Sequence, residues 1–293
     1  MSAGSMRLRF HATMVPSLMV NAEFKMAVPL MPGDEKVKKH SVPYTQPAAP
    51  PHVMADETHH ACGQLADYFP PELMSCGALA IASITRHQRV LRKGEYLYHM
   101  GDNLTSLHII RSGSIKTSRL TTDGRIQVIG FHVTSDVIGV DAISDMQHPS
   151  NAVALEPSEL CVIPYFWLEE LAQTRRELQR GLLQLLSREI VRDEELMLML
   201  GRQNAEARLA SCLLSLSRRA PPGRSDERQL TLSMSRQDLA DYLGLAVETV
   251  SRLFSRLQDQ GILQVSNRRI RLLDRARLEI VVERCTSSHR LHG

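Results

Sequence analysis

Five polar side chains near the C-terminal end of the chain have the types and the spacing to hydrogen-bond to the edges of DNA bases. If residues 247–258 form a helix, a rotation of about 100° per residue gathers these side chains on one face. They are Glu248, Ser251, Arg252, Ser255 and Arg256. Arginine can donate twice to guanine, glutamate can accept from cytosine, and serine can do either. The opposite face carries Val247, Val250, Leu253, Phe254 and Leu257, so the helix can pack on a core while its polar side faces outward.

The elements on either side would position this helix. Ser235 and Asp238 have the spacing of a helix capping box, which predicts a preceding helix, and Gly244 then supplies a turn. After the polar segment, residues 263–272 predict a hairpin around a basic turn. Helix, glycine turn, helix and basic hairpin together predict a winged helix-turn-helix domain over residues 204–280.

The distribution of charge supports this interpretation. The whole chain carries 35 Lys and Arg against 32 Asp and Glu, a formal charge of +3. Residues 1–201 carry 19 basic and 22 acidic side chains, whereas residues 202–293 carry 16 and 10, and all 16 are arginine. Such a basic region is typical of nucleic-acid binding. For the polar face of residues 247–258 taken alone, an ordinary solvated helix face is the alternative. We assign phosphate contacts, which carry no sequence information, to Arg236, Arg268 and Arg269.

Residues 58–168 have the pattern of an all-β domain. From about Arg89 to Pro164, short apolar runs alternate with glycine-containing turns. Asp123–Gly124 lies between two such runs and predicts a hairpin. We therefore expect a sandwich or barrel of short strands.

A helical pattern over residues 169–203 predicts a long dimerisation helix. One line of positions recurs along it with gaps of 4, 3, 4, 3 and 4: Leu182, Leu186, Glu189, Asp193, Leu196 and Leu200. This spacing is typical of a coiled-coil seam between two chains. The two acids in the seam indicate a weakened homodimer, in which a second input decides the monomer–dimer balance. The alternative is a helix that packs only within its own subunit, with its acids in solvent.

The remaining features of the sequence concern the two ends of the chain and the location of the protein in the cell. Residues 1–57 are rich in proline without a sustained period, which predicts either a disordered extension or an over-called start codon, and residues 281–293 are assigned to a tail. Five cysteines at no disulfide-like spacing favour a reducing, cytoplasmic location. Because no apolar run of about 18 residues occurs, we expect no membrane partner.

The stretch from Asp238 to Leu253, DLADYLGLAVETVSRL, resembles the helix-turn-helix of the Crp/Fnr transcription regulators and is close to their Fnr branch. Residues 131–132, 141–143, 148–150 and 204–209 also look Fnr-like, and the resemblance covers about residues 62–278. It implies an α+β chain with a jelly-roll β-roll sensor like a cyclic nucleotide-binding domain, a dimerisation helix and a winged helix-turn-helix. It further implies that Glu248, Ser251 and Arg252 read an inverted repeat of the TTGAT…ATCAA kind, and that the acid at Asp193 regulates dimerisation.

The oxygen sensors of this branch hold a [4Fe–4S] cluster, which needs four convergent thiolates. By this resemblance Cys161 stands at the β-roll ligand position and Cys62 at one N-terminal position, with His59 as a substitute ligand beside it. Three interpretations stay open: no metal, which we favour; an oxygen-labile iron–sulfur cluster; and a thiol switch or another metal site.

Cyclic AMP is not expected. Family members that bind cAMP use a Gly-Glu-Leu segment and a following Arg-Ser, where this chain has Gly139-Val140-Asp141 and His148-Pro149-Ser150. No arginine occurs between Asp136 and Pro164, and a buried phosphate needs a cation. The sequence also lacks a phosphate-binding loop and a His-Glu-x-x-His zinc site, so we do not expect an enzyme.

We therefore predict a homodimeric, sequence-specific transcription regulator that binds double-stranded DNA and RNA polymerase. The resemblance favours an activator linked to oxygen limitation or redox state over a repressor. The alternative function is a β-roll ligand-binding or interaction module whose contact with DNA is incidental.

Overall fold

The computed structural model describes residues 70, 81, 84–85, 87–219 and 229–287. The predicted extension over residues 1–57, together with His59 and Cys62, lies outside these residues. In the described part of the chain, no helix is both long and apolar enough to cross a membrane.

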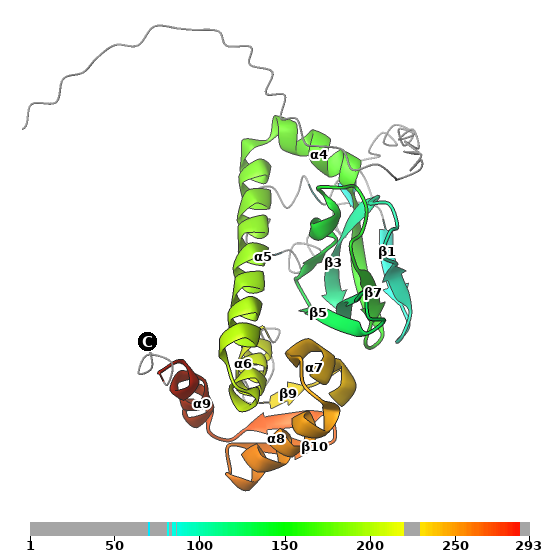
Figure 1. Ribbon diagram of the computed structural model, residues 1–293. Coiled ribbons are helices and arrows are strands. Elements are labelled where there is room, and N and C mark those ends of the chain that lie inside the picture. The colour runs from blue at the N-terminus through cyan, green and yellow to red at the C-terminus, as the bar shows by residue number, and fades with distance from the viewer. Residues whose placement is uncertain (1–69, 71–80, 82–83, 86, 220–228, 288–293) are drawn as a thin grey trace, which may run out of the picture. The chain divides into compact units, whose positions relative to one another are not determined.

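The N-terminal domain is a β-roll of two antiparallel four-stranded sheets (Figure 1). One sheet has the strand order β1-β8-β3-β6, made of His87–Leu91, Ser158–Pro164, Ser106–Ser112 and Val137–Ile138. The other has the order β2-β7-β4-β5, made of Tyr96–Tyr98, Asn151–Ala154, Ser114–Leu120 and Ile126–Val133. A single turn of 3-10 helix, Val140–Ala142, follows β6. The predicted all-β domain of short strands is confirmed.

Two apolar clusters hold the β-roll together. Inward-facing side chains of both sheets, among them Leu91, Ile110, Ile115 and Leu160, are fully buried against one another. The outer face of the first sheet packs on the helices that follow, through a second cluster that includes Cys161. Alternate residues of a strand point to opposite faces, so strand β8 serves both clusters.

The β4–β5 hairpin has the turn that the sequence predicts at Asp123–Gly124. Leu120 pairs with Ile126 at the end of the ladder, and the Gly124 N–H donates to the Thr121 carbonyl at 2.9 Å. Gly124 has a φ of +79°, a conformation that favours glycine.

Three helices follow the β-roll. Helix α4, Tyr165–Thr174, ends at Arg175, whose extended backbone separates it from α5, Arg176–Arg202. Helix α6, Ala205–Arg218, starts at the N-cap Asn204, whose side chain accepts a hydrogen bond from the Ala207 N–H at 2.9 Å. The predicted domain boundary between residues 168 and 169 falls inside α4.

The C-terminal domain is an antiparallel three-stranded sheet with a helix-turn-helix. Its elements are β9 Gln229–Thr231, α7 Arg236–Leu243, α8 Val247–Asp259, β10 Leu263–Ser266 and β11 Arg269–Leu272, followed by α9 Arg275–Ser287. The predicted α+β class is confirmed.

The assignment of a separate tail from residue 281 is wrong at its start, because α9 crosses that boundary. Leu278 is fully buried, and Val281 and Val282 pack on the core of the C-terminal domain. The alternation of arginine and apolar residues in this stretch is too irregular to indicate the helix from the sequence.

Candidate nucleic-acid interface

The entry to the helix-turn-helix is fixed by the predicted capping box. The Asp238 N–H donates to Ser235 Oγ at 3.0 Å, and the Ser235 N–H donates to Asp238 Oδ2 at 2.8 Å. Aspartate therefore replaces the glutamate that usually occupies this position. Between the two helices, Gly244 has a φ of +63°, and the following Leu245 N–H donates to the Ala240 carbonyl at 3.0 Å. This glycine lets the chain turn from α7 into α8 within a few residues.

Helix α8 has the two faces that the sequence predicts. Its buried side chains are Val250, Leu253, Phe254 and Leu257, and Val247 is half-buried. They belong to one apolar cluster with Leu239 and Leu243 of α7. Its exposed side chains include Glu248, Ser251, Arg252, Ser255 and Arg256. The apolar face therefore anchors α8 and leaves all five candidate base-reading residues accessible.

The candidate base-reading residues differ in how they are held. Ser251 Oγ donates to the Val247 carbonyl at 3.0 Å, and Ser255 Oγ donates to the Ser251 carbonyl at 3.3 Å. Each hydroxyl oxygen keeps its lone pairs for a DNA donor. Arg256, which is largely exposed, lies 3.7 Å from the half-buried Glu206 of α6, a long ion pair. Such a pair contributes little and can be exchanged for a phosphate.

The basic hairpin lies in β10 and β11. Asn267 takes a φ of +57° in the two-residue turn, and the neighbouring Arg268 and Arg269 are exposed. The Arg268 guanidinium donates to the Ser233 carbonyl at 3.1 Å, which ties the turn to the segment before α7. Arg271, which the sequence analysis did not select, is exposed on the same face of β11 as Arg269. The period of two along a strand is the signal that finds it.

Arg236 differs from the other predicted phosphate contacts. Its guanidinium carbon lies 3.3 Å from the centre of the Phe254 ring, and the side chain is half-buried. Burial lowers its pKa from the ordinary value. The arginine is thus part of the packing between α7 and α8, which makes Arg268 and Arg269 the stronger candidates for phosphate contacts.

The structure separates the six predicted seam residues of α5 into two groups. Leu182 packs on the β-roll cluster, and Leu196 and Leu200 pack on the cluster of the C-terminal domain. Glu189 accepts a hydrogen bond from Arg192 at 2.6 Å. These four positions therefore contact their own subunit. Leu186 is half-buried and Asp193 is exposed.

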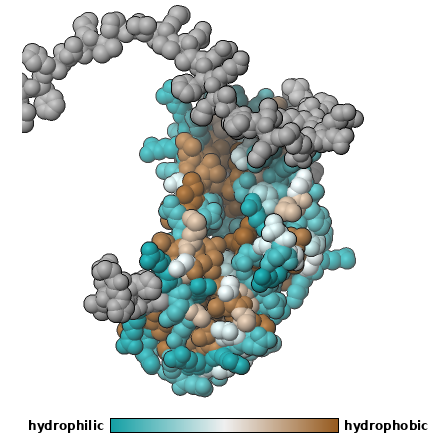
Figure 2. All heavy atoms as spheres, in the orientation of Figure 1, coloured by the Kyte–Doolittle hydropathy of each residue, from teal (hydrophilic) through white to brown (hydrophobic). Residues whose placement is uncertain are grey.

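A second line of apolar residues, which shares Leu186 with the predicted seam and otherwise lies one position along from it, is more accessible. The exposed fractions of Leu183, Ile190 and Met197 are 62%, 59% and 65%. Figure 2 shows apolar side chains gathered along α5 on the face in view. Together with Leu186, these residues are spaced at 3, 4 and 7 positions, which is typical of a coiled-coil seam. We call Leu183, Leu186, Ile190 and Met197 the α5 stripe.

Cys161, the one candidate cluster ligand among the described residues, lies on β8 with no exposed surface. It packs among the side chains that join the first sheet to α4 and α5, and burial raises the pKa of its thiol. Both features are those of a structural cysteine and not of an exposed, reactive thiolate. The described residues contain no group of three or more His, Cys, Asp and Glu side chains arranged to hold a metal ion.

The segments 139–141 and 148–150, which the sequence analysis compared with the cAMP-binding segments of the family, contact each other and β2. The Tyr98 and His148 rings stack with their centres 3.6 Å apart, and Ser150 Oγ donates to Asp141 at 3.3 Å. A carboxylate at Asp141 repels a phosphate. Burial lowers the pKa of His148, against the opposing effect of Asp141 and Asp102.

Comparisons with known proteins agree with this arrangement. Residues 88–175 match the cyclic nucleotide-binding domain, and residues 207–280 match the Crp-like helix-turn-helix domain. Over 195 residues, the chain is 40% identical to the transcriptional activator protein Anr of Pseudomonas protegens, covering 67% of this chain and 80% of Anr. Over 195 residues it is 43% identical to the fumarate and nitrate reduction regulatory protein of Vibrio cholerae, covering 67% and 78%.

A solved structure of a similar protein matches the fold of this chain. FixK2 from Bradyrhizobium japonicum is 34% identical, with a TM-score of 0.62, and the match covers 67% of this chain and 96% of FixK2. The matched relatives named here are regulators and not enzymes. The chain therefore belongs to the Crp/Fnr family of DNA-binding transcription regulators, in its Fnr-like branch.

Proposed function

We propose that the chain is a dimeric transcription activator that reads an inverted-repeat DNA site through α8 of each subunit. The observation that carries this proposal is the exposure of Glu248, Ser251 and Arg252 on a helix whose other face is buried. Those are the residue types that recognise base edges in the major groove. Arg268 and Arg269 lie at the end of the hairpin, where they would contact phosphates beside the recognised bases.

The test is fluorescence anisotropy with a duplex that carries a TTGAT…ATCAA repeat, with half-sites about 10 bp apart, and with a scrambled duplex. We expect the full chain to prefer the repeat. Arg252→Ala should lose that preference while the circular dichroism spectrum is unchanged. Arg125→Ala is the control, because Arg125 is exposed at the tip of the β4–β5 hairpin, outside the C-terminal domain. If Arg252→Ala binds the repeat as tightly as the wild type, the alternative of an interaction module with incidental DNA contact is favoured.

The dimer forms, in this proposal, along the α5 stripe. Three of its four side chains are more than half exposed in a single chain, and exposed apolar rows at heptad spacing bury themselves against a second copy. Asp193 lies on the same side of the helix, between Ile190 and Met197 in sequence, and is exposed. Two copies would bring their Asp193 carboxylates close together, which weakens the dimer and leaves room for regulation.

The direction and the signal of regulation rest on the relatives. Anr is named a transcriptional activator, and the Vibrio cholerae relative is named for fumarate and nitrate reduction. We propose activation of genes for oxygen limitation, with contact to RNA polymerase, in the cytoplasm. Transcription in vitro with purified polymerase tests the sign directly: repression by the bound chain would contradict activation.

We propose that neither cAMP nor a [4Fe–4S] cluster at Cys161 sets the activity. Two observations support this proposal: the Cys161 side chain is fully buried in the cluster that joins the first sheet to the helices, and the carboxylate of Asp141 accepts a hydrogen bond from Ser150. Anaerobic purification followed by iron and sulfide analysis tests whether the chain holds a cluster. Calorimetric titration with cAMP tests whether the chain binds this nucleotide, and micromolar affinity would contradict the proposal.

A further inference from the structure

The β4–β5 hairpin contacts the helix-turn-helix directly. Lys116 of β4 pairs with Asp238, the residue that closes the capping box of α7. Gln127 of β5 donates to the Asp241 carbonyl in the same helix. Below these polar contacts, Phe131 of β5 packs on Tyr242 with the ring centres 5.0 Å apart. The hairpin is therefore a contact surface for the C-terminal domain as well as a part of the β-roll.

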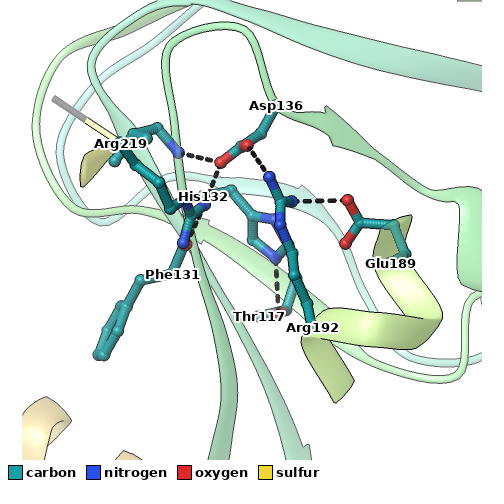
Figure 3. A network of polar contacts seen from close by, with 8 residues as sticks. Thr117, Phe131, His132, Asp136, Glu189, Arg192 and Arg219 are labelled. Carbon is teal, nitrogen blue, oxygen red and sulfur yellow. Dashed lines mark hydrogen bonds and ion pairs between the residues drawn. The ribbon is translucent and has the colours of Figure 1, made fainter. Parts of the chain in front are cut away.

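A second ionic contact lies in the turn that follows β5 (Figure 3). The Asp136 carboxylate, only 7% exposed, pairs with Arg219 at the C-cap of α6 and with Arg192 of α5 at 3.1 Å. Arg219 also donates to the Phe131 carbonyl at 2.9 Å. The Val133 N–H donates to Asp136 at 2.7 Å, which holds the carboxylate in place within the β-roll. One buried anion thus joins the β-roll, the long helix and the helix that begins the C-terminal domain.

The two ionic contacts have opposite polarity. The β-roll supplies the cation at Lys116 and the anion at Asp136, and the C-terminal domain supplies the anion at Asp238 and the cation at Arg219. Exchanging the two contacts would bring like charges together. Complementary pairs of this kind select one orientation more than they add affinity.

The position of α6 determines the position of α8, the helix that carries the candidate base-reading residues. Arg208 of α6 donates to the Leu243 carbonyl at the end of α7 at 3.0 Å and to the Leu200 carbonyl of α5 at 2.7 Å. Helix α8 packs on α7 through their shared apolar cluster. A rotation of α6 would therefore carry the exposed face of α8 with it.

The contacts with the β-roll leave the recognition face accessible. They involve α7 and the C-cap of α6, whereas Glu248, Ser251 and Arg252 of α8 remain exposed. This arrangement is compatible with DNA binding and does not inhibit it by covering the reading face.

We infer that Asp136 is a positioning residue, which holds each helix-turn-helix at the orientation that lets both subunits reach their half-sites at once. The inference rests on the proposed function, because it concerns how a dimer engages an inverted repeat. Arg192 lies next to Asp193 in α5, so the same carboxylate links the dimerisation helix to α6. The signal that changes the dimer would reach the DNA-binding domain through Asp136. Burial alone would raise the pKa of Asp136, but Arg219, His132 and Arg192 lower it overall and keep the group ionised.

The test compares two duplexes, one with both half-sites and one with a single half-site and a scrambled partner. Asp136→Asn should bind the full site about tenfold more weakly than the wild type. Two helix-turn-helix domains held in a fixed orientation bind the second half-site at a higher effective concentration than two domains that move freely. Its affinity for the single half-site should be unchanged, since α8 itself is intact. Lys116→Met removes the other ionic contact at a partly exposed side chain and should act in the same direction.

Asp123→Asn is the matched control, because Asp123 lies at the exposed tip of the same hairpin and pairs only locally with Arg125. Thermal unfolding followed by circular dichroism shows whether each variant folds, and if Asp136→Asn does not fold, Lys116→Met decides. The inference is overturned if the folded variants bind the full site as the wild type does, or if they lose the same factor on both duplexes. A wild-type chain that does not prefer the full site over scrambled DNA would instead contradict the proposed function.

Discussion

The guanidinium of Arg236 stacks on the ring of Phe254, with 3.3 Å between the guanidinium carbon and the ring centre. This contact joins the first turn of α7 to the buried face of α8. Arg236, which the sequence analysis assigned to a phosphate contact, therefore packs against Phe254 instead. The arginines of this domain thus fall into those that pack on the core and those that face solvent.

The salt dependence of DNA binding measures that division. Replacing Arg268 or Arg269 by Ala should lower the slope of log affinity against log salt by about 1 for each residue, because each exposed arginine releases about one counterion. Arg236→Ala should leave the slope unchanged and lower the melting temperature instead. A reduced slope for Arg236→Ala would show that the side chain leaves Phe254 when DNA binds.

The monomer–dimer equilibrium tests the α5 stripe. Asp193→Ala should tighten the dimer about tenfold in sedimentation equilibrium, because it removes two like charges that meet in the interface. Burial, and then Asp141, already raises the pKa of Asp193 in the single chain. Lowering the pH toward the pKa of this carboxyl should therefore also favour the dimer.

Glu195→Ala is the control for this prediction, because Glu195 is exposed on α5 but lies away from the stripe. It should leave the dimer constant unchanged. An equal effect of the two substitutions would mean that net charge, and not the stripe, governs association.

The buried side chain of His132 should make the free energy of unfolding depend on pH. Burial lowers the pKa of His132 from 6.5 to about 4, with Asp136 opposing and Arg219 adding to this effect. Between those values the unfolded chain binds a proton that the folded chain excludes, so the free energy of unfolding falls as the pH drops. The loss for His132 is about 3 kcal/mol between pH 7 and pH 4.

Urea unfolding at several pH values measures this dependence. His132→Gln can keep a hydrogen bond to Thr117 Oγ1, which lies 3.0 Å from His132 Nε2, and it should flatten the profile by about one proton. His99→Gln, at an exposed position, is the control. A profile that is the same for wild type and His132→Gln would show that His132 titrates normally.

Arg208 predicts a stability effect at the junction of three helices. Its guanidinium donates to the carbonyls of Gln203, Leu243 and Leu200, which lie in or just after the last turns of α5 and α7. Arg208→Met keeps the apolar stem but leaves these carbonyls without their cation, at a cost of about 2 kcal/mol in urea unfolding. Arg208→Lys should recover part of that stability. Equal stabilities for wild type and Arg208→Met would contradict the assignment.

The helix-turn-helix could be predicted closely because its signals are local. The capping box at Ser235, the glycine at Gly244 and the separation of polar from apolar residues along α8 each act within a few positions. The hairpin at Gly124 is predictable for the same reason.

The rest depends on packing that no short stretch contains. Two lines of residues at similar spacing run along α5, and the spacing alone does not show that Leu182 faces the β-roll while Leu183 faces solvent. The contacts of Asp136 with Arg192 and Arg219 join residues 56 and 83 positions apart, so the sequence gives no sign of them.

The most direct test of the central claim pairs a protein substitution with a base substitution. Wild type and Arg252→Ala are titrated against the TTGAT…ATCAA repeat and against a duplex in which the guanine of each half-site is replaced. If Arg252 reads that guanine, the wild type loses about tenfold or more on the altered duplex, whereas Arg252→Ala binds both duplexes alike. Equal discrimination by the two proteins would show that Arg252 does not read that guanine and would contradict the proposed role of this side chain.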